Sequence, residues 1–146
     1  MSANSLRFDL VDHVLVVVHA DVAPDDDDWR RLMLVRDANR ARIRGNLVIA
    51  PPRASINAAQ RADVAAFLKE TGSSIAVLTD SALIRGVALA VGLAGVKVRA
   101  FQSNELAKAL SYLVVPPSRQ ADLSARIDRM KSQLAVLERT SRQARA

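Results

Sequence analysis

The stretch from residue 73 to residue 94 constrains the fold more than any other part of the chain. Ser73–Thr79 is a short β-prone run, and after a turn at Asp80 and Ser81 the segment Ala82–Ala94 is apolar on nearly every side. A strand and a helix that both lack a polar face are expected where helices cover both faces of a sheet. The stretch therefore predicts the centre of an α/β domain.

Strand-like and helix-like segments alternate on both sides of this centre. The opening predicts two strands, Leu6–Val11 and Val14–Ala20, joined by a turn at Asp12 and His13. The remaining predicted elements are a helix from Trp29 to Arg44, a strand at 46–50, a helix from Asn57 to Thr71, a half-exposed edge strand at 96–100 and a short helix ending at Leu113. We predict an α/β fold: a mixed sheet of about five strands with about four helices, followed by a C-terminal helical tail.

Several helix starts are marked by residues that cap free amides. Asp25–Asp28 precede Trp29, where carboxylates oppose the positive end of the helix dipole, and Asp28 is the predicted cap. A divalent cation site is the alternative, but the glycine spacing of a calcium loop is missing. Asn57 and Gln60 have the spacing of a capping box. Ser103 or Asn104 is predicted to cap the short helix.

Most of the excess positive charge of the chain lies in its last 29 residues. Residues 1–117 hold 14 basic and 12 acidic side chains, whereas residues 118–146 hold seven and three, within a total net charge of +6. Only five aromatic side chains are present to stack on bases, so nucleic-acid binding is not expected. The absence of cysteine excludes disulfides, thiolate metal sites and a cysteine nucleophile.

The opening residues and the longest apolar run indicate where in the cell the protein is expected. The start of the sequence lacks a basic stretch followed by an apolar run, so we expect no signal peptide. The apolar run Val87–Val96 is far shorter than the roughly 20 residues of a membrane span. We therefore expect a cytoplasmic protein without a membrane span.

The tail carries a regular apolar pattern. Its members are spaced four, three, four and three residues apart, like the seam of a coiled coil; we call Leu123, Ile127, Met130, Leu134 and Leu137 the tail seam. Only about two heptads are present, so the helix needs a surface to lie on. That surface is either its own domain or another subunit. We divide the chain into a domain at 1–117 and a basic amphipathic helix at 118–146 that contacts a partner or a second copy.

The order of elements and several short segments together resemble a known family. The segments are Trp29, Asn57–Arg61, Ala76–Ser81 with Arg85 and Gly86, and Phe101 with Ala109–Leu113. Residues 6 to about 115 resemble the STAS fold in its SpoIIAA-like branch of small bacterial proteins, also described as STAS/SEC14-like. The resemblance implies a non-enzymatic module that scaffolds or regulates by self-association or by docking to a protein partner, without a cofactor.

The same resemblance implies one candidate phosphorylation site. In the anti-sigma-factor antagonists of the family, a serine in an Asp-Ser-Ser-Gly motif is phosphorylated at the turn into the helix after the third strand. That motif is absent here, and Ser55 matches only as a serine near the corresponding helix start. A plain loop or capping serine is the alternative interpretation.

A small-ligand or lipid-binding protein is a further hypothesis. Open α/β sheets bind ligands beyond the carboxyl ends of their strands. The candidate ligand residues at those ends are Arg53, Asn57, Asp80, Ser81 and Arg85. Arg53 and Arg85 could bind an anionic headgroup; alternatively, Arg85 pairs with Asp80 on its own helix turn.

The sequence offers little for catalysis. His13 and His19 are the only histidines, and no Gly-x-Ser-x-Gly elbow accompanies them. A metal site from His13, His19 and Asp21 would need a further ligand. We therefore predict neither an enzyme nor a metal site.

Overall fold

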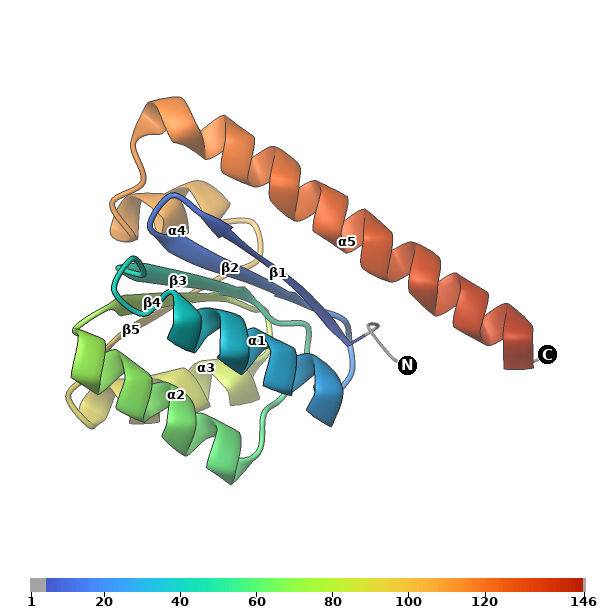
Figure 1. Cartoon of the computed structure of the whole chain (residues 1–146), viewed down its shortest axis with the longest axis horizontal. Coiled ribbons are helices and arrows are strands. Elements are labelled where there is room, and N and C mark those ends of the chain that lie inside the picture. Colours follow the sequence, from blue (N-terminus) through green and yellow to red (C-terminus); the bar gives the residue numbers. More distant parts are fainter. Residues whose placement is uncertain (1–4, 146) are drawn as a thin grey trace.

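A computed structural model describes residues 5–145 of the chain as five strands and five helices built around one sheet (Figure 1). The strands are β1 (Leu6–Val11), β2 (Val14–His19), β3 (Gly45–Ile49), β4 (Ser74–Leu78) and β5 (Lys97–Phe101). The helices are α1 (Asp26–Ala38), α2 (Ala58–Thr71), α3 (Ala82–Leu93), α4 (Leu106–Tyr112) and α5 (Pro117–Arg145). Residues 1–4, on which the signal-peptide expectation partly rests, lie outside the described residues.

The sheet confirms the predicted α/β fold with a mixed five-stranded sheet. Its strand order is β1-β2-β3-β4-β5, in which β1 and β2 are antiparallel and the remaining neighbours are parallel. The opening hairpin pairs Leu6 with His19 and Val11 with Val14, around a turn at Asp12 and His13. Asp12 takes a positive φ of 55°, which aspartate tolerates better than most residues.

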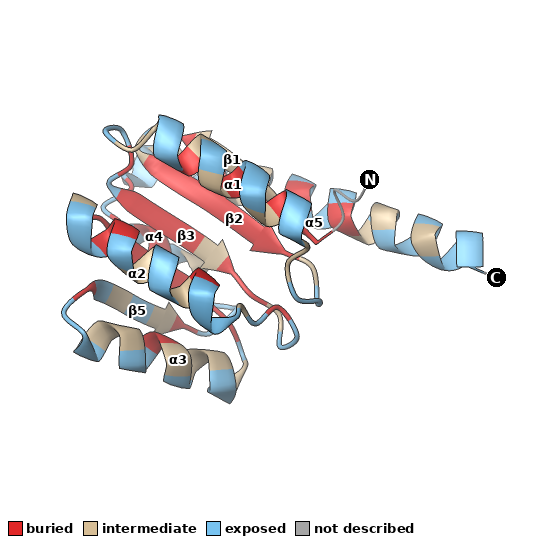
Figure 2. Cartoon of the chain, turned by 60° about the horizontal axis from the view of Figure 1, so that its bottom comes forward, coloured by how far each residue is buried: buried red, intermediate tan, exposed pale blue. Residues whose placement is uncertain are grey.

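The connections between strands decide which helices cover which face. Each parallel strand lies beside the previous one, and right-handed crossovers that all advance in one direction place their helices on the same face. Accordingly α1, α2 and α3 lie on one face of the sheet (Figure 2), while α4 and α5 lie on the other. Side chains alternate along β2: Val14, Val16 and Val18 face α4 and α5, whereas Leu15 and Val17 face the other three helices.

The long helix α5 packs against its own sheet. Leu123, Ile127, Met130 and Leu134 of the tail seam are buried in one core with β2, and Leu137 is half-buried. Ion pairs fix its direction across the hairpin, with Arg126 2.9 Å from Asp9 and Arg119 3.0 Å from Asp12. Beyond the tail seam the helix projects past the body of the molecule (Figure 1).

The start of α1 differs from the prediction. Asp25, not Asp28, is the cap: its extended backbone precedes the first turn, and its Oδ1 accepts hydrogen bonds from the amides of Asp27 and Asp28. Asp28 is buried and accepts hydrogen bonds from the amide and hydroxyl of Ser5, at 3.0 and 2.5 Å, while it also pairs with Arg31. A run of four aspartates does not show which one turns inward.

Two other helix boundaries also differ from the prediction. Helix α1 ends at Ala38, because Asn39 leaves the helical conformation and its side-chain amide donates to the carbonyl of Val35 at 2.8 Å. Helix α4 follows Glu105, which accepts from the amide of Gln102. Neither Ser103 nor Asn104 caps α4: Glu105 occupies that position, and Ser103 donates both its amide and its hydroxyl to Asp80.

None of the helices within residues 5–145 combines enough length with enough apolar character to cross a membrane. Helix α5 is the longest, but charged side chains are distributed along it.

Candidate functional site

A cavity of about 740 Å³ lies between the sheet and helices α1, α2 and α3; we call it the chamber. Its lining includes exposed side chains, Ala62 of α2 and Leu83 of α3, so the chamber opens to solvent between these two helices. Its floor is formed by alternate side chains of the strands, including Leu15, Val17, Val48, Ile75, Val77 and Val98. Most of the lining is apolar.

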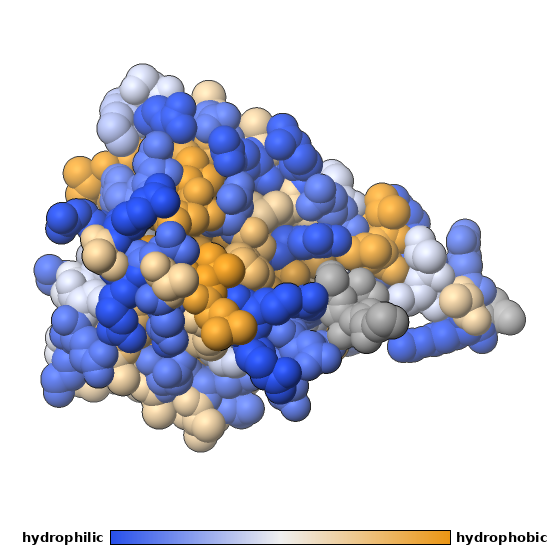
Figure 3. Space-filling view, in the orientation of Figure 1, coloured by the Kyte–Doolittle hydropathy of each residue, from blue (hydrophilic) through white to orange (hydrophobic). Residues whose placement is uncertain are grey.

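Helix α3 forms a wall of the chamber with apolar side chains both inside and outside. Ile84, Ala88 and Val91 line the chamber, and Ala88 is the buried residue of this helix. On the outer side, Leu89 and Leu93 are 68% and 82% exposed. Hydrophobic side chains also reach the surface in the middle of the body on the face drawn in Figure 3, where hydrophilic ones surround them.

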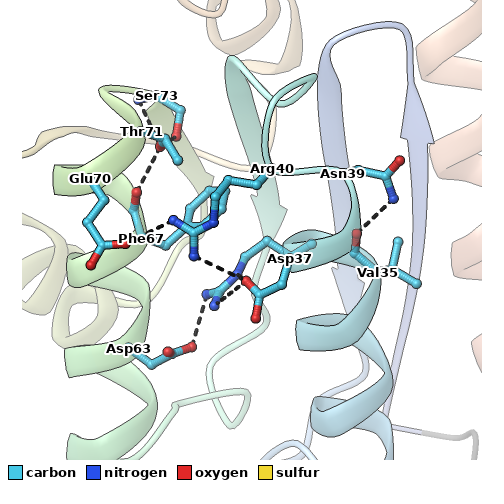
Figure 4. Close-up of polar contacts among 10 residues, drawn as sticks. Val35, Asp37, Asn39, Arg40, Asp63, Phe67, Glu70, Thr71 and Ser73 are labelled. Carbon is cyan, nitrogen blue, oxygen red and sulfur yellow. Dashed lines mark hydrogen bonds and ion pairs between the residues drawn. The ribbon is translucent and has the colours of Figure 1, made fainter.

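Polar contacts join α1 and the segment after it to α2 beside the chamber. Arg36 is buried and lies 2.9 Å from both Asp37 and Asp63. Arg40, two residues beyond the end of α1, reaches Glu70 of α2, also at 2.9 Å. Both guanidinium groups stack on the Phe67 ring, at 4.5 and 5.0 Å from its centroid. Figure 4 shows Arg40 reaching from the segment after α1 towards Glu70 and the Phe67 ring of α2.

Two polar side chains lie on the floor of the chamber, at opposite ends of the strands. Asn46, at the amino end of β3, donates to the carbonyl of Ser74 at 3.0 Å and to the hydroxyl of Ser73 at 3.3 Å. His19, at the carboxyl end of β2, is buried, and its Nδ1 has no hydrogen-bond partner among the described residues. Burial lowers the pKa of His19 from 6.5 to about 4, so its ring is neutral at pH 7.

The rim of the chamber at the carboxyl ends of the strands is polar. Ser55 is exposed there, and Ile56 follows it along the lining. Arg61, half-buried on the first turns of α2, donates from Nη1 to the carbonyl of Ile56 at 2.6 Å. Trp29 also lines the chamber, and it is the single tryptophan of the chain.

The predicted ligand residues do not line the chamber. Arg53 is exposed, and its amide donates to Asp21 at 2.8 Å. Asn57 caps α2, as predicted: it exchanges hydrogen bonds of 2.8 and 2.9 Å with Gln60. The candidate phosphosite Ser55 lies on the chamber rim, two positions before that cap.

The candidate ligand residues at the start of α3 also make hydrogen bonds within the protein. Asp80 accepts hydrogen bonds from the hydroxyl and the amide of Ser103, at 2.6 and 3.0 Å, and these lower the pKa of its carboxyl, with a smaller contribution from the charge of Arg85. Ser81 caps α3 by accepting from the amide of Ile84 at 3.2 Å. The predicted pairing of Asp80 with Arg85 is thus secondary to the contact with Ser103.

The strand order explains why the two loops do not form one crevice. Ligand crevices at the carboxyl ends of open sheets form where the strand order reverses. In this sheet the order advances from β2 to β5 without reversal, so neighbouring loops lie side by side with no opening between diverging connections. The space instead lies between the sheet and the helices.

The sequence contained partial signals for the residues that do line the chamber. His19 follows Leu15 and Val17 at alternate positions, which places it on the same face of β2. Arg61 stands in the segment Asn57–Arg61 that carried the family resemblance, but nothing in its spacing distinguished it from Arg53. No group of three or more metal-ligating side chains is present within residues 5–145.

Comparisons with protein-family models, with curated proteins and with solved structures found no match to this chain. The resemblance to the STAS family therefore stays a prediction.

Proposed function

We propose that this protein binds an apolar or amphipathic small molecule in the chamber. The observation that carries the proposal is the chamber itself: about 740 Å³ of mostly apolar space between the sheet and the helices, open to solvent on one side. The volume lies in the range of sites for small ligands, about 300 to 1,000 Å³. An apolar ligand would supply the contacts that the lining side chains lack.

The polar groups around the chamber support binding without catalysis. Among the described residues no hydroxyl donates to Nδ1 of His19, so this base is not paired with a nucleophile there. Arg36 is held by Asp37 and Asp63. These contacts are typical of a site that binds and orients a ligand. They favour the small-ligand or lipid-binding hypothesis drawn from the sequence.

The other two hypotheses have less support from the described contacts. A docking role for the tail seam requires apolar side chains that a partner can reach, yet Leu123, Ile127, Met130 and Leu134 are buried against the sheet of their own chain. A phosphorylation switch requires an accessible hydroxyl, and Ser55 meets only that condition. Both remain predictions.

Native mass spectrometry of the protein purified from its own host tests the proposal directly. A bound small molecule would add mass under native conditions, and this mass would disappear under denaturing conditions. Extraction with organic solvent would then identify the ligand. A protein that carries no added mass and binds no apolar probe would contradict the proposal.

A larger side chain on α2 that fills part of the chamber should weaken ligand binding while it stabilises the fold. We expect Ala65→Leu to weaken the binding of an apolar probe about tenfold, equivalent to ~1.4 kcal/mol, because Ala65 lines the chamber. The same change should stabilise the unliganded protein by about 1 kcal/mol, as cavity-filling substitutions commonly do. Quenching or shift of Trp29 fluorescence measures binding, and urea denaturation measures stability.

Ala66→Leu is the matched control, since Ala66 is the next residue along α2 but is exposed and outside the lining. Both its affinity and its stability should stay close to those of the parent protein. Equal effects of the two substitutions would show that the space beneath α2 is not where the probe binds.

A further inference from the structure

The charges around the chamber differ in whether they are already neutralised. Three basic side chains line it: His19, Arg36 and Arg61. Because Arg36 lies 2.9 Å from two carboxylates, its charge is balanced within the protein. His19 is neutral at pH 7, since burial lowers its pKa to about 4. Neither group therefore needs an anion from outside.

Arg61 is different, because no acidic side chain of the described residues pairs with its charge. The one hydrogen bond described for its guanidinium goes to the backbone carbonyl of Ile56, and it makes no ion pair within residues 5–145. Asp63, two residues further along α2, is directed to Arg36 instead. A guanidinium has five donors in a fixed fork, so most of its donors remain available.

The position of Arg61 places this free charge where the apolar chamber meets solvent. It is half-buried, and Ile56, to which it is bonded, lines the chamber beside the exposed Ser55. It belongs to the first turns of α2, where the helix dipole also favours an anion. Partial burial strengthens an ion pair relative to one in bulk water.

We propose that the ligand of the chamber is a long-chain carboxylic acid, whose hydrocarbon chain lies along the floor of the sheet and whose carboxylate pairs with Arg61 at the rim. This inference rests on the proposed function. A guanidinium matches a carboxylate through two parallel hydrogen bonds. One unpaired cation matches one negative charge, and the hydroxyl of Ser55 lies on the same rim as a further donor.

Two probes of equal chain length test the head group. Dodecanoate and dodecanol are titrated below the concentrations at which they form micelles, with Trp29 fluorescence as the readout. We expect the protein to bind dodecanoate about tenfold more tightly, since a hydrogen bond to a charged group contributes about 1.5 to 3 kcal/mol net and Arg61 is partly solvated. Arg61→Gln should remove this preference and leave dodecanol binding unchanged.

Arg53→Gln is the matched control, because Arg53 belongs to the same connection but does not line the chamber. It should keep the tenfold preference. Arg61→Lys should keep part of it, since lysine retains the charge but not the fork. Circular dichroism verifies that each variant is folded, which is expected because Arg61 is half-exposed.

The outcomes distinguish the inference from the function on which it rests. Equal affinities for the acid and the alcohol in the parent protein would overturn the carboxylate assignment and leave the binding function intact. A preference that survives Arg61→Gln but is lost in Arg53→Gln would overturn the role of Arg61. Failure of both probes to bind would contradict the proposed function itself.

Discussion

Replacing Ile127 by alanine is expected to lower the free energy of unfolding by about 3 kcal/mol, within the range of about 2 to 5 kcal/mol for such changes at buried sites. Ile127 is 1% exposed and lies in the core formed by α4, α5 and the valines of β2. The cost has two parts: the lost burial of the side chain, and the void that its neighbours cannot fill. Urea denaturation followed by far-ultraviolet circular dichroism measures it.

Val136→Ala provides the control on the same helix. Val136 is 51% exposed, so its truncation should change the free energy of unfolding by less than about 0.5 kcal/mol. If the two substitutions had equal effects, α5 would not be packed on the sheet in solution. A tail seam that served only contacts with a second copy would also make the effect of Ile127→Ala depend on protein concentration, whereas packing within one chain predicts no such dependence.

The second large effect is a loss of stability in acid caused by His19. Burial lowers the pKa of this group from 6.5 to about 4, so the unfolded chain takes up a proton at a higher pH than the folded protein does. The titration of His19 therefore leaves the free energy of unfolding unchanged well above pH 6.5. It lowers this free energy as the pH decreases from 6.5 towards 4. The loss should reach about 3 kcal/mol, since each unit of pKa difference corresponds to ~1.36 kcal/mol.

His19→Leu isolates this contribution from the carboxylates that titrate in the same range. The difference in unfolding free energy between the parent protein and the variant is measured in urea at a series of pH values. It should change by about 3 kcal/mol between pH 7 and pH 4 in favour of the variant. Because leucine removes a buried nitrogen that has no hydrogen-bond partner among residues 5–145, the variant should be at least as stable at pH 7. A pH-independent difference would show that His19 is accessible to water.

Much of the architecture could be predicted because it depends on local pattern. The continuous apolar run Val14–Val18 is buried along its length in β2, as expected for a strand inside the sheet. The alternation of Lys97–Phe101 matches the half-exposed edge strand β5. The predicted capping box of Asn57 and Gln60 is present at the start of α2. Each of these features is set by residues close together in the sequence.

Features that depend on contacts between distant residues were harder to predict from the sequence. Asp28 is buried because it meets Ser5, 23 positions earlier, and neighbouring aspartates offered no sign of this contact. Whether the tail seam would face its own domain or another subunit stayed open. The answer depends on all three crossover helices lying on one face, which leaves the opposite face of β2 to be covered by α4 and α5.

The chamber could not be predicted at all, for a physical reason. Periodicity shows which side chains face inward, but a cavity is a difference between the space that the backbones enclose and the volume of those side chains. Leu15 and Val17 on β2 would be expected on the floor of either a solid core or a hollow one. The small residues that leave the space open, such as Ala54, Ala65 and Ala88, are also ordinary helix and loop residues.

The position of α5 along the chain has a consequence for folding kinetics. The ion pairs that fix it join residues 117 and 107 positions apart, between Arg126 and Asp9 and between Arg119 and Asp12. Contacts between such distant residues form slowly because a long loop must close before they can contribute. Until α5 docks, the valines of β2 on that face have only α4 to cover them, and such exposed apolar rows favour aggregation. Because the hairpin is synthesised before α5, the docking of α5 sets how long this face of the sheet remains exposed to aggregation.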